Sequence, residues 1–505
     1  MFDAFVQGLL VNLQPWPFIY LLIGAAIGFC VGILPGLGGG TTLSLMLPFI
    51  YTMRPQEALP FLLGMHSVCA TTGDITSVLF GIPGEAASVA TIVDGYPMTK
   101  KGEAGRALGA VLMSSLVGAI VGAAFLAVTI PFVAPLVLSC GSPEMFMLIL
   151  LGFTCIATLS GHGKRGLLLG LLSGVLGFMC SLVGQDKQAG ILRFTFDLLY
   201  LWEGLPLVPV MIGLFAIPEV VDLAVRGTGI ASQAPLGKLG KGAMEGIKDT
   251  FRHFGLTMRC SIIGAIAGII PGLGGGITQW LSYAHARGSA KNEAEREGFG
   301  QGDVRGVLGP GACNNSKEGA NLIPTIAFGV PAGTGMAILM GGFLLMGLVP
   351  GPDMLTKHLA LTYSMVWTIV IANVIAVAVS LLFINHLAKL TLVRGNLMIP
   401  VILLFCFIGT YMSSESIGDI IILLIFGVLG CLMLRCRWPR PPFILGFILG
   451  KLAERYLYIS SMRYGLSWLY RPKVIFLFLI IVSFCLYPYI QMKLARGELG
   501  EPDKI

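Results

Sequence analysis

Two glycine-rich segments of the chain carry a pattern that suits the binding of anions. The first contains Gly38, Gly39, Gly40, Thr41 and Thr42. The second contains Gly274, Gly275, Gly276 and Thr278. A glycine-rich break before a helix exposes unpaired N–H groups, and the helix dipole adds partial positive charge at the same end. We therefore predict that both segments bind an anionic substrate, with close helix packing on the glycines as the alternative.

An acid within an apolar stretch suggests a second kind of site, one for a cation. Asp74 has no Lys or Arg near it in the sequence. A charged side chain at membrane depth is costly and is a functional hypothesis by default. Because hard cations prefer oxygen ligands, we predict that Asp74, Thr72 and Asn321 hold Na⁺. The alternative for Asp74 is the N-cap of a helix.

The second half of the chain offers amide side chains and a lysine in a matching stretch. Asn314 and Asn315 carry donors for a carboxylate and carbonyl oxygens for a cation. Lys317 is a candidate for substrate contact, and the alternatives are pairing with another acid or reaching an aqueous cavity. Since Lys317 and Glu318 are adjacent in sequence, we expect that they do not face each other on a helix.

The remaining candidates for substrate binding lie in the same broken stretches and are Ser77, Gly84 and Thr334. Glu85 is interpreted as the partner of a helix dipole rather than as a ligand. His66 is interpreted as a buried, hydrogen-bonded histidine. We predict no catalytic residue, and no cofactor beyond Na⁺ or H⁺ as a coupling ion.

The composition identifies the class of protein that must position these residues. Of 505 residues, 12% are charged and 55% are hydrophobic, whereas an ordinary soluble protein is roughly 25% charged. This excludes a soluble enzyme, a disordered protein and a nucleic-acid binder. Apolar residues run the whole length, which also excludes a single-pass receptor. The sequence therefore predicts an all-α, polytopic helical protein of the lipid bilayer with about 10–12 spans.

The predicted spans are apolar segments long enough to cross a bilayer. They lie at 18–34, 107–138, 144–160, 167–184, 198–224, 256–270, 359–387, 396–413, 417–434 and 474–490. Three other apolar regions, 35–93, 271–286 and 306–350, are interrupted by Pro-Gly or Gly-Gly steps. Such breaks survive at membrane depth only inside protein or beside a wet cavity, so function is expected there, in broken helices or re-entrant hairpins.

The chain repeats itself. Ile33–Gly40 recurs 236 residues later as Ile269–Gly276, and Phe80-Gly81-Ile82-Pro83 recurs 248 residues later as Phe328-Gly329-Val330-Pro331. Matches in the same order predict two repeats, 1–235 and 236–505. In matched loops only one member is clearly basic, so the positive-inside rule predicts inverted topology. The connector 226–259 is basic and is predicted to be cytoplasmic. The basic segment 455–473 disagrees with this counting.

At these residues the sequence resembles the large membrane subunit of tripartite tricarboxylate transporters. The stretches that carry the resemblance are Leu34–Thr42, Ile75–Val89, Asp94–Met98, Gly105–Gly109, Pro271–Gly276, Asn314-Asn315, Leu322–Pro324 and Phe328–Pro331. Three features depart from the family pattern. Pro310–Cys313 differs from the usual residues before the paired Asn, Lys317-Glu318 replaces small residues, and Asp74 stands where Ser is common.

The resemblance implies a permease of the bacterial cytoplasmic (inner) membrane. It implies two partners, a small four-helix membrane subunit and a periplasmic solute-binding protein that captures the substrate. The implied substrates are di- or tricarboxylates such as citrate, imported with an ion gradient rather than ATP. We therefore expect a secondary transporter. The alternatives are an intramembrane enzyme that uses Asp74, and a channel or scaffold subunit.

Overall fold

The structure is a computed structural model, and it describes residues 1–34, 38–85, 88–159, 163–186, 188–226, 239–271, 273, 275–385 and 395–498. The first half contains α1 (Phe2–Asn12), α2 (Pro15–Gly32), α3 (Gly39–Met46), η1 (Leu47–Ile50), α4 (Pro55–Phe80), α5 (Val89–Lys100), α6 (Ala104–Leu138), α7 (Ser142–Leu159), α8 (Gly163–Ser181), β1 (Gly184–Gln185), β2 (Leu192–Arg193), η3 (Leu199–Leu201), α9 (Leu207–Met211), the π-helix η4 (Ile212–Ala216) and α10 (Ile217–Arg226). β1 and β2 pair antiparallel.

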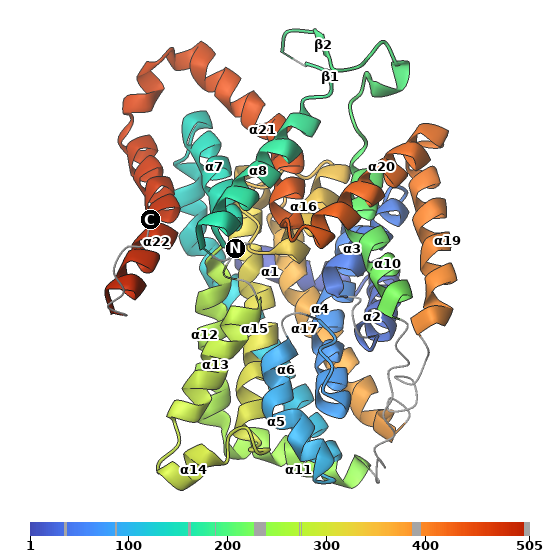
Figure 1. The fold of residues 1–505 in the computed structure, drawn as a ribbon, viewed down its shortest axis with the longest axis vertical. Helices are drawn as coiled ribbons and strands as arrows, with labels where there is room; N and C mark the ends of the chain where they lie inside the picture. The colour runs from blue at the N-terminus through green and yellow to red at the C-terminus, as the bar shows by residue number, and fades with distance from the viewer. Residues whose placement is uncertain are drawn as a thin grey trace.

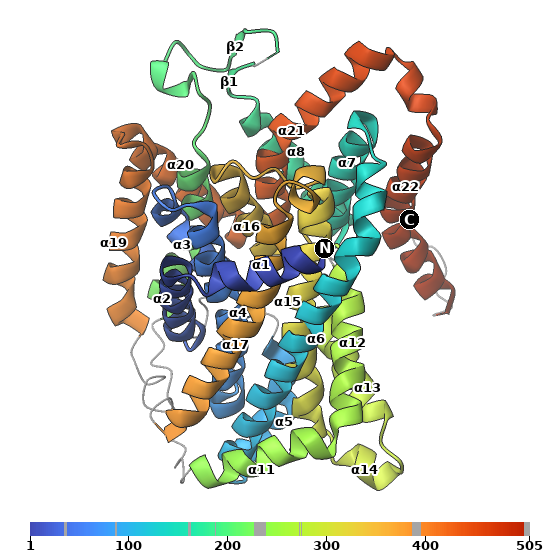
Figure 2. The same cartoon turned by 180° about the vertical axis from the view of Figure 1, so that it is seen from behind.

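The second half contains α11 (Leu239–Arg252), α12 (Phe254–Ile269), α13 (Gly275–Gly288), α14 (Glu293–Glu297), α15 (Arg305–Phe328), α16 (Thr334–Leu345), η5 (Pro352–Leu355), α17 (Leu359–Leu382), α19 (Gly395–Ser414), α20 (Ile417–Arg435), α21 (Arg440–Tyr464), η6 (Ser467–Tyr470) and α22 (Pro472–Glu498). In both views α4, α15 and α17 lie in the middle of the bundle, with α19 and α22 on opposite sides (Figures 1 and 2).

The all-α, polytopic prediction is confirmed. Within the described part of the chain, five helices are long and apolar enough to cross a membrane. They are Pro15–Gly32, Ala104–Leu138, Leu207–Val225, Leu359–Leu382 and Ile417–Arg435. Shorter apolar helices match other predicted spans: Ser142–Thr154, Gly166–Ser181, Phe254–Ile269, Ile399–Ser414 and Pro472–Phe484. The predicted span 198–224 is partly wrong. The observed apolar helix begins at Leu207, and residues 198–206 belong to the segment that connects the β1–β2 hairpin to it.

α4 and α15 are long helices that are buried on nearly every side. Thr71, Thr72 and Ser77 donate their hydroxyls to carbonyls three or four residues earlier, so the polar run continues the helix. The N-cap alternative for Asp74 is therefore wrong, because Asp74 lies inside α4. The breaks come later, where Gly81 (φ 68°) and Gly329 (φ 66°) end the two helices in the left-handed region.

Glycines spaced by four residues bring the helices together in the same way in both halves. In α2, Gly28 lies against the carbonyl of Met65 on α4. In α12, Gly264 lies against the carbonyl of Cys313 on α15. In lipid the hydrophobic effect does not drive helices together, and small residues instead let the helix backbones approach closely and pack. Both contacts keep the offsets of the sequence repeat, 236 residues between the glycines and 248 between their partners.

The two ends of the bundle carry different structures. α11 lies across one end beside α14, whereas the β1–β2 hairpin and the turn between α21 and α22 lie at the other end (Figures 1 and 2). At the α11 end, Arg106 donates to Asp249 at 2.6 Å. One of the matched basic loops used to predict the topology is 94–106, and this segment is mostly helix because α5 continues to Lys100 and α6 begins at Ala104. In the basic segment 455–473, Arg471 pairs with Glu144 at 3.1 Å, which neutralises part of its charge.

Candidate functional site

The centre of the candidate site is a chain of three charged or titratable side chains where α4 meets α15. Nε2 of His66 lies 3.0 Å from Oε2 of Glu318, and Nζ of Lys317 lies 2.7 Å from Oε1 of the same carboxylate. All three side chains are at most 8% exposed. The expectation that Lys317 and Glu318 do not face each other is wrong, because the long lysine side chain folds back onto its neighbour. Pairing with an acid, the simpler alternative for Lys317, is the observed arrangement.

His66 is held between the first residues of two helices that follow backbone breaks. A Cβ on Gly39 would lie 2.6 Å from Nδ1 of His66, and a Cβ on Gly335 would collide with the same ring at Cε1. Gly39 opens α3 and Gly335 is the second residue of α16. The two glycines are therefore required at these places for the imidazole to fit between the helices. The interpretation of His66 as buried and hydrogen-bonded holds for Nε2.

Several of the residues predicted to bind substrate meet around this imidazole. A Cβ on Gly40 would lie 3.8 Å from the methyl group of Thr334, so the N-termini of α3 and α16 are adjacent. A Cβ on Gly38 would lie 3.7 Å from Cβ of Glu85, so the break after α4 reaches the same place. Gly38, Gly40 and Thr334 are partly exposed, whereas His66 behind them is buried. The structure thus brings Gly38, Gly39, Gly40 and Thr334 together.

The two threonines that follow the first glycine segment make hydrogen bonds within α3 and its start. Oγ1 of Thr42 donates to the carbonyl of Gly38 at 3.2 Å, one turn earlier. The carbonyl of Thr41 accepts the hydroxyl of Ser44 at 2.8 Å. Both threonines are buried. They support the first turn of α3, which begins at Gly39 beside His66.

A network of uncharged side chains lies next to His66, Lys317 and Glu318 and extends towards α17. Nδ2 of Asn315 donates to Oγ1 of Thr71 at 2.6 Å and to Oδ1 of Asn373 at 2.9 Å. Nδ2 of Asn373 donates to the hydroxyl of Ser67 at 2.6 Å. Asn373 was not predicted as a site residue, although an amide in the apolar run 359–387 was a signal for it. Asn315 thus ties α4, α15 and α17 together.

Asn314 connects the two long helices at a second point. Its Nδ2 donates to the carbonyl of Ala70 at 3.1 Å and lies 3.5 Å from Asp74. Asp74 accepts the hydroxyl of Thr91 on α5 at 3.1 Å. Within the described chain, Oδ1 of Asn314 and Oδ1 of Asn315 have no hydrogen-bond partner. These carbonyl oxygens are free to accept from a ligand.

The three residues predicted to hold Na⁺ lie against different helices. Asp74 faces α5 and α15, as described above. Thr72 donates to the carbonyl of Val68 and lies 3.4 Å from the carbonyl of Gly28 on α2. With its amide group turned, Asn321 donates to the carbonyl of Gly268 on α12 at 2.9 Å. The structure does not bring the three together. In the described ranges it also contains no cluster of three or more His, Cys, Asp or Glu side chains that could hold a metal ion.

Ser77 and Gly84 have packing contacts of their own. Oγ of Ser77 lies 3.3 Å from the carbonyl of Gly73, inside α4. A Cβ on Gly84 would lie 2.5 Å from the same carbonyl, so the segment after α4 folds back onto the helix it leaves. This turn positions Glu85 beside Gly73 and Gly38. Among the described residues, Oε1 of Glu85 has no hydrogen-bond partner.

The second glycine segment has a different environment from the first. Gly274 lies outside the described residues, and Gly275 and Gly276 open α13. The carbonyl of Thr278 accepts the thiol of Cys313 on α15 at 3.4 Å. α13 packs on α15, α12 and α5, whereas α3 packs on α4 and α16. Inverted halves lead to the expectation that the two glycine segments face each other near the midplane, whereas in the structure they lie against different helices.

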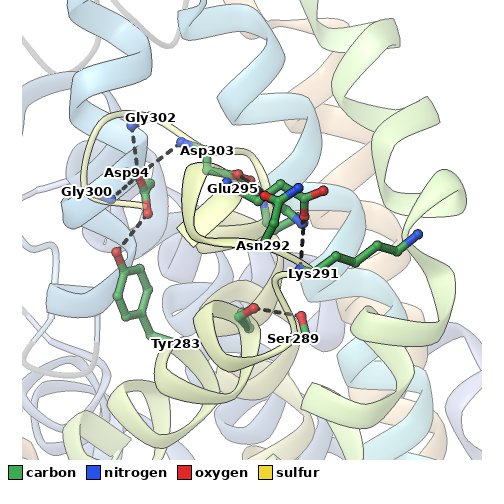
Figure 3. A network of polar contacts seen from close by, with 11 residues as sticks. Asp94, Tyr283, Ser289, Lys291, Asn292, Glu295, Gly300, Gly302 and Asp303 are labelled. Atoms are coloured by element: carbon green, nitrogen blue, oxygen red, sulfur yellow. Dashed lines mark hydrogen bonds and ion pairs between the residues drawn. The ribbon is translucent and has the colours of Figure 1, made fainter. Parts of the chain in front are cut away.

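The contact between α13 and α5 is made by a buried acid that the sequence did not single out. Oδ2 of Asp94 accepts the hydroxyl of Tyr283 at 2.9 Å. Oδ1 accepts the backbone N–H groups of Gly300, Gly302 and Asp303 at 2.7, 2.8 and 3.0 Å (Figure 3). Gly300 and Gly302 have φ values of 84° and 101°, which turn these amides towards the carboxylate. Asp94 occurs in one of the stretches that carry the family resemblance, which was its only signal.

The loop that wraps Asp94 is itself fixed by an ion pair outside the membrane-spanning segments. Arg305, at the start of α15, pairs with Asp303 at 2.8 Å and with Glu295 of α14 at 2.7 Å. The hydrogen bond from the Arg305 guanidinium holds the pKa of Glu295 below its usual range. This arrangement holds α14 against the end of α15.

Comparison with known proteins identifies the family. The sequence matches the Tripartite tricarboxylate transporter TctA family over residues 18–445. The chain belongs to this family. A protein of Agrobacterium vitis described as an "Uncharacterized 52.8 kDa protein in TAR-I ttuC' 3'region" is 33% identical over 450 residues, 88% of this chain and 87% of the relative. A second A. vitis protein, "in TAR-II ttuC' 3'region", is 33% identical over 194 residues, 38% of this chain and 79% of the relative. No solved structure matches.

Membership of the family makes the chain the large membrane subunit of a tripartite tricarboxylate transporter, a transport protein that crosses the membrane several times. The family match includes α3, α4, α15 and α16, and therefore every side chain of the site around His66. The family name concerns transport and not catalysis.

Proposed function

We propose that this TctA-family subunit is a secondary active transporter that imports small di- or tricarboxylates such as citrate. The observation that carries the proposal is the meeting of the N-termini of α3 and α16 at His66 in the middle of the bundle. Each N-terminus offers unpaired N–H groups and partial positive charge. Two such ends suit an anion with carboxylates at both ends, one on each helix.

The charges around the site favour a ligand that is held mainly by backbone amides. The carboxylate of Glu318 already pairs with Lys317 and His66, so Lys317 is not a free counter-ion for substrate. Glu85 adds a negative charge at the rim of the site. The breaks before α3 and α16 therefore supply the anion-binding groups, as in transporters whose discontinuous helices point their N-termini at a carboxylate.

We further propose that the two halves, 1–235 and 236–505, are inverted repeats. The contacts of α4 with α15 support this. Residue 66 contacts residue 318, and residue 70 contacts residue 314. Adding 248 to the α4 member of one pair gives the α15 member of the other. Such an exchange of partners is expected when a two-fold axis relates α4 to α15 and the two helices run antiparallel.

The assembly and location follow from the family, and we propose them on that ground. The partners are a small four-helix membrane subunit and a periplasmic solute-binding protein that delivers the substrate. The membrane is the bacterial inner membrane, with α11 and the rest of the connector 226–259 on the cytoplasmic side. Uptake is driven by a gradient of H⁺ or Na⁺ rather than by ATP.

Proteoliposomes test the proposal. The chain is reconstituted with its small membrane subunit, the binding protein is added outside, and uptake of labelled citrate, malate and succinate is measured with an imposed proton or sodium gradient. We expect saturable uptake of at least one acid that stops when the gradient is collapsed. Uptake of none of them, with all subunits present and folded, would refute the proposal.

A further inference from the structure

The two ring nitrogens of His66 have different surroundings. Nε2 lies 3.0 Å from the carboxylate of Glu318. Nδ1 lies beside Gly39, at the start of α3, and has no hydrogen-bond partner among the residues that the structure describes. The side chain is 8% exposed. A buried polar atom without a partner is costly, so Nδ1 is placed to meet a group that enters the site.

Every element packed around the ring contributes to its electrostatics. α15 contributes Lys317 and Glu318, and the break after α4 contributes Glu85. On α4 itself the nearest titratable side chain is the thiol of Cys69, while Asp74 lies two turns further along and bonds to Thr91 and Asn314. α3 and α16 contribute their N-terminal amides at Gly39 and Gly335, and no charged side chain of their own.

These surroundings determine the protonation of the ring in the absence of an anion. A neutral imidazole carries one N–H, and Glu318 fixes it on Nε2. A second proton on Nδ1 would point its N–H at the positive ends of two helices. Lys317 opposes a further positive charge on the ring, whereas Glu318 and Glu85 favour one. Above the pH range in which the free ring is charged, the ring is neutral and its Nδ1 lone pair faces the site.

A bound carboxylate extends the protonated state of the ring to higher pH. An oxygen that accepts N–H groups of α3 and α16 lies next to Nδ1, where its negative charge favours the protonated ring. The imidazolium then donates Nε2–H to Glu318 and Nδ1–H to the carboxylate. Both nitrogens are satisfied only in this state. Proton and anion thus stabilise each other in one site.

We propose that His66 takes up one proton on Nδ1 when the carboxylate binds, so that the site carries a proton together with its anion. The inference rests on the proposed function and specifies the coupling ion as H⁺. The proton comes from water on the side where substrate enters. It returns to water when the carboxylate leaves on the other side and the two helix ends again face the ring.

The proposal has a quantitative consequence. By linkage, an anion that binds with one proton loses affinity about tenfold for each pH unit above the range where the free ring is charged. A site that binds the anion without a proton shows no such slope. The slope is measured above the highest pKa of the acid, so that the charge of the acid itself is constant.

The experiment measures the Kd of the transported acid as a function of pH with the purified full chain in lipid nanodiscs. We expect a slope of one proton in the wild type, no slope in His66→Gln, and an unchanged slope in Asp74→Asn, which alters a buried acid that bonds to Thr91 and Asn314 and not to His66. A slope that persists in His66→Gln, or that disappears in Asp74→Asn instead, would overturn the proposal.

A second measurement does not depend on a variant. In weak buffer with a pH indicator, at a pH above the range where the free ring is charged, wild-type protein should take up about one proton per bound anion. Anion binding without proton uptake, or binding that requires Na⁺ at constant pH, would overturn the assignment to His66 while leaving carboxylate transport intact. Failure to bind any of the three acids, together with failure of uptake in proteoliposomes, would instead refute the proposed function.

Discussion

Two contacts between the halves, that of α3 with α16 and that of α5 with α13, each contain a buried polar side chain. The hydrogen bonding of that side chain is complete in one contact and incomplete in the other. At the contact of α3 with α16, Nδ1 of His66 has no partner among the described residues, and Gly38, Gly40 and Thr334 are partly exposed. At the contact of α5 with α13, the carboxylate of Asp94 accepts four donors and is fully buried (Figure 3).

The difference distinguishes a binding site from a structural contact, which we call the clamp and which consists of Asp94, Tyr283 and the backbone amides of Gly300, Gly302 and Asp303. A buried acceptor whose lone pairs are all used can stabilise the fold, and it offers nothing to a ligand. A buried polar atom without a partner beside two helix N-termini is a place where a ligand completes the hydrogen bonding. We infer that the α3–α16 contact binds substrate and that the Asp94 contact holds the two halves together.

The largest expected effect comes from breaking the charged chain at the α3–α16 contact. Glu318→Gln leaves the charge of Lys317 buried without a partner, which should cost about 3–5 kcal/mol of stability and abolish uptake. The double variant Lys317→Met/Glu318→Gln removes both charges and should recover most of the lost stability. Thermal unfolding and proteoliposome uptake measure the two effects separately.

The double variant decides whether the charges serve only the fold. Since it removes the carboxylate that supports a protonated His66, we expect its uptake to stay at background although the protein is folded. Wild-type uptake by the folded double variant would contradict the account.

A smaller effect is expected from filling the space next to the imidazole. In Gly335→Ala the new methyl group collides with Cε1 of His66. Overpacking of this kind costs about 1–3 kcal/mol, which corresponds to roughly tenfold to hundredfold weaker substrate binding. The matched control is Gly288→Ala, because a Cβ on Gly288 meets nothing within 4 Å. Equal affinities of the two variants, measured as Kd, would show that the ring does not need this space.

A substitution in the clamp should lower the free energy of unfolding and leave the affinity for substrate unchanged. Asp94→Asn retains one carbonyl oxygen for the three backbone amides but loses the charge and the acceptor for Tyr283. We expect a loss of about 1.5 kcal/mol in the free energy of unfolding and an unchanged Kd for the transported acid. A change in Kd without a change in stability would place substrate contact at Asp94 and reverse our assignment of the two contacts.

The smallest effect is expected for Tyr283→Phe, which removes a single donor to Asp94. The cost should be about 0.5–1.5 kcal/mol, measured by denaturant unfolding. In a double-mutant cycle with Asp94→Asn, the two losses should not add, because both variants remove the same hydrogen bond. Additive losses would mean that Tyr283 stabilises the protein by packing alone.

The fold could be predicted well because the apolar composition of membrane-spanning helices and the internal sequence repeat are properties of long segments. The apolar runs located the spans at 107–138, 359–387 and 417–434 to within a few residues. Helix ends were harder. The polar run Thr71–Ser77 does not show where its helix ends, because the hydroxyls bond back along α4 and the helix ends at Gly81, where the backbone is left-handed.

The candidate site was predicted only in part. Gly38–Gly40 and Thr334 were found because glycine before a helix has a chemical consequence that can be read locally. The role of His66 could not be read, since it depends on Glu318 and on two glycines 27 residues before it and 269 residues after it. Asp94 was missed for the same reason: its donors are backbone amides of a loop more than 200 residues away.

The most direct test is a structure of the chain with the transported carboxylate bound, in lipid and with the small membrane subunit. The account predicts one carboxylate group within hydrogen-bonding distance of Nδ1 of His66 and of backbone amides at the starts of α3 and α16, with Asp94 unchanged in its loop. A carboxylate bound between α13 and α5, or on a lipid-facing surface away from His66, would contradict it.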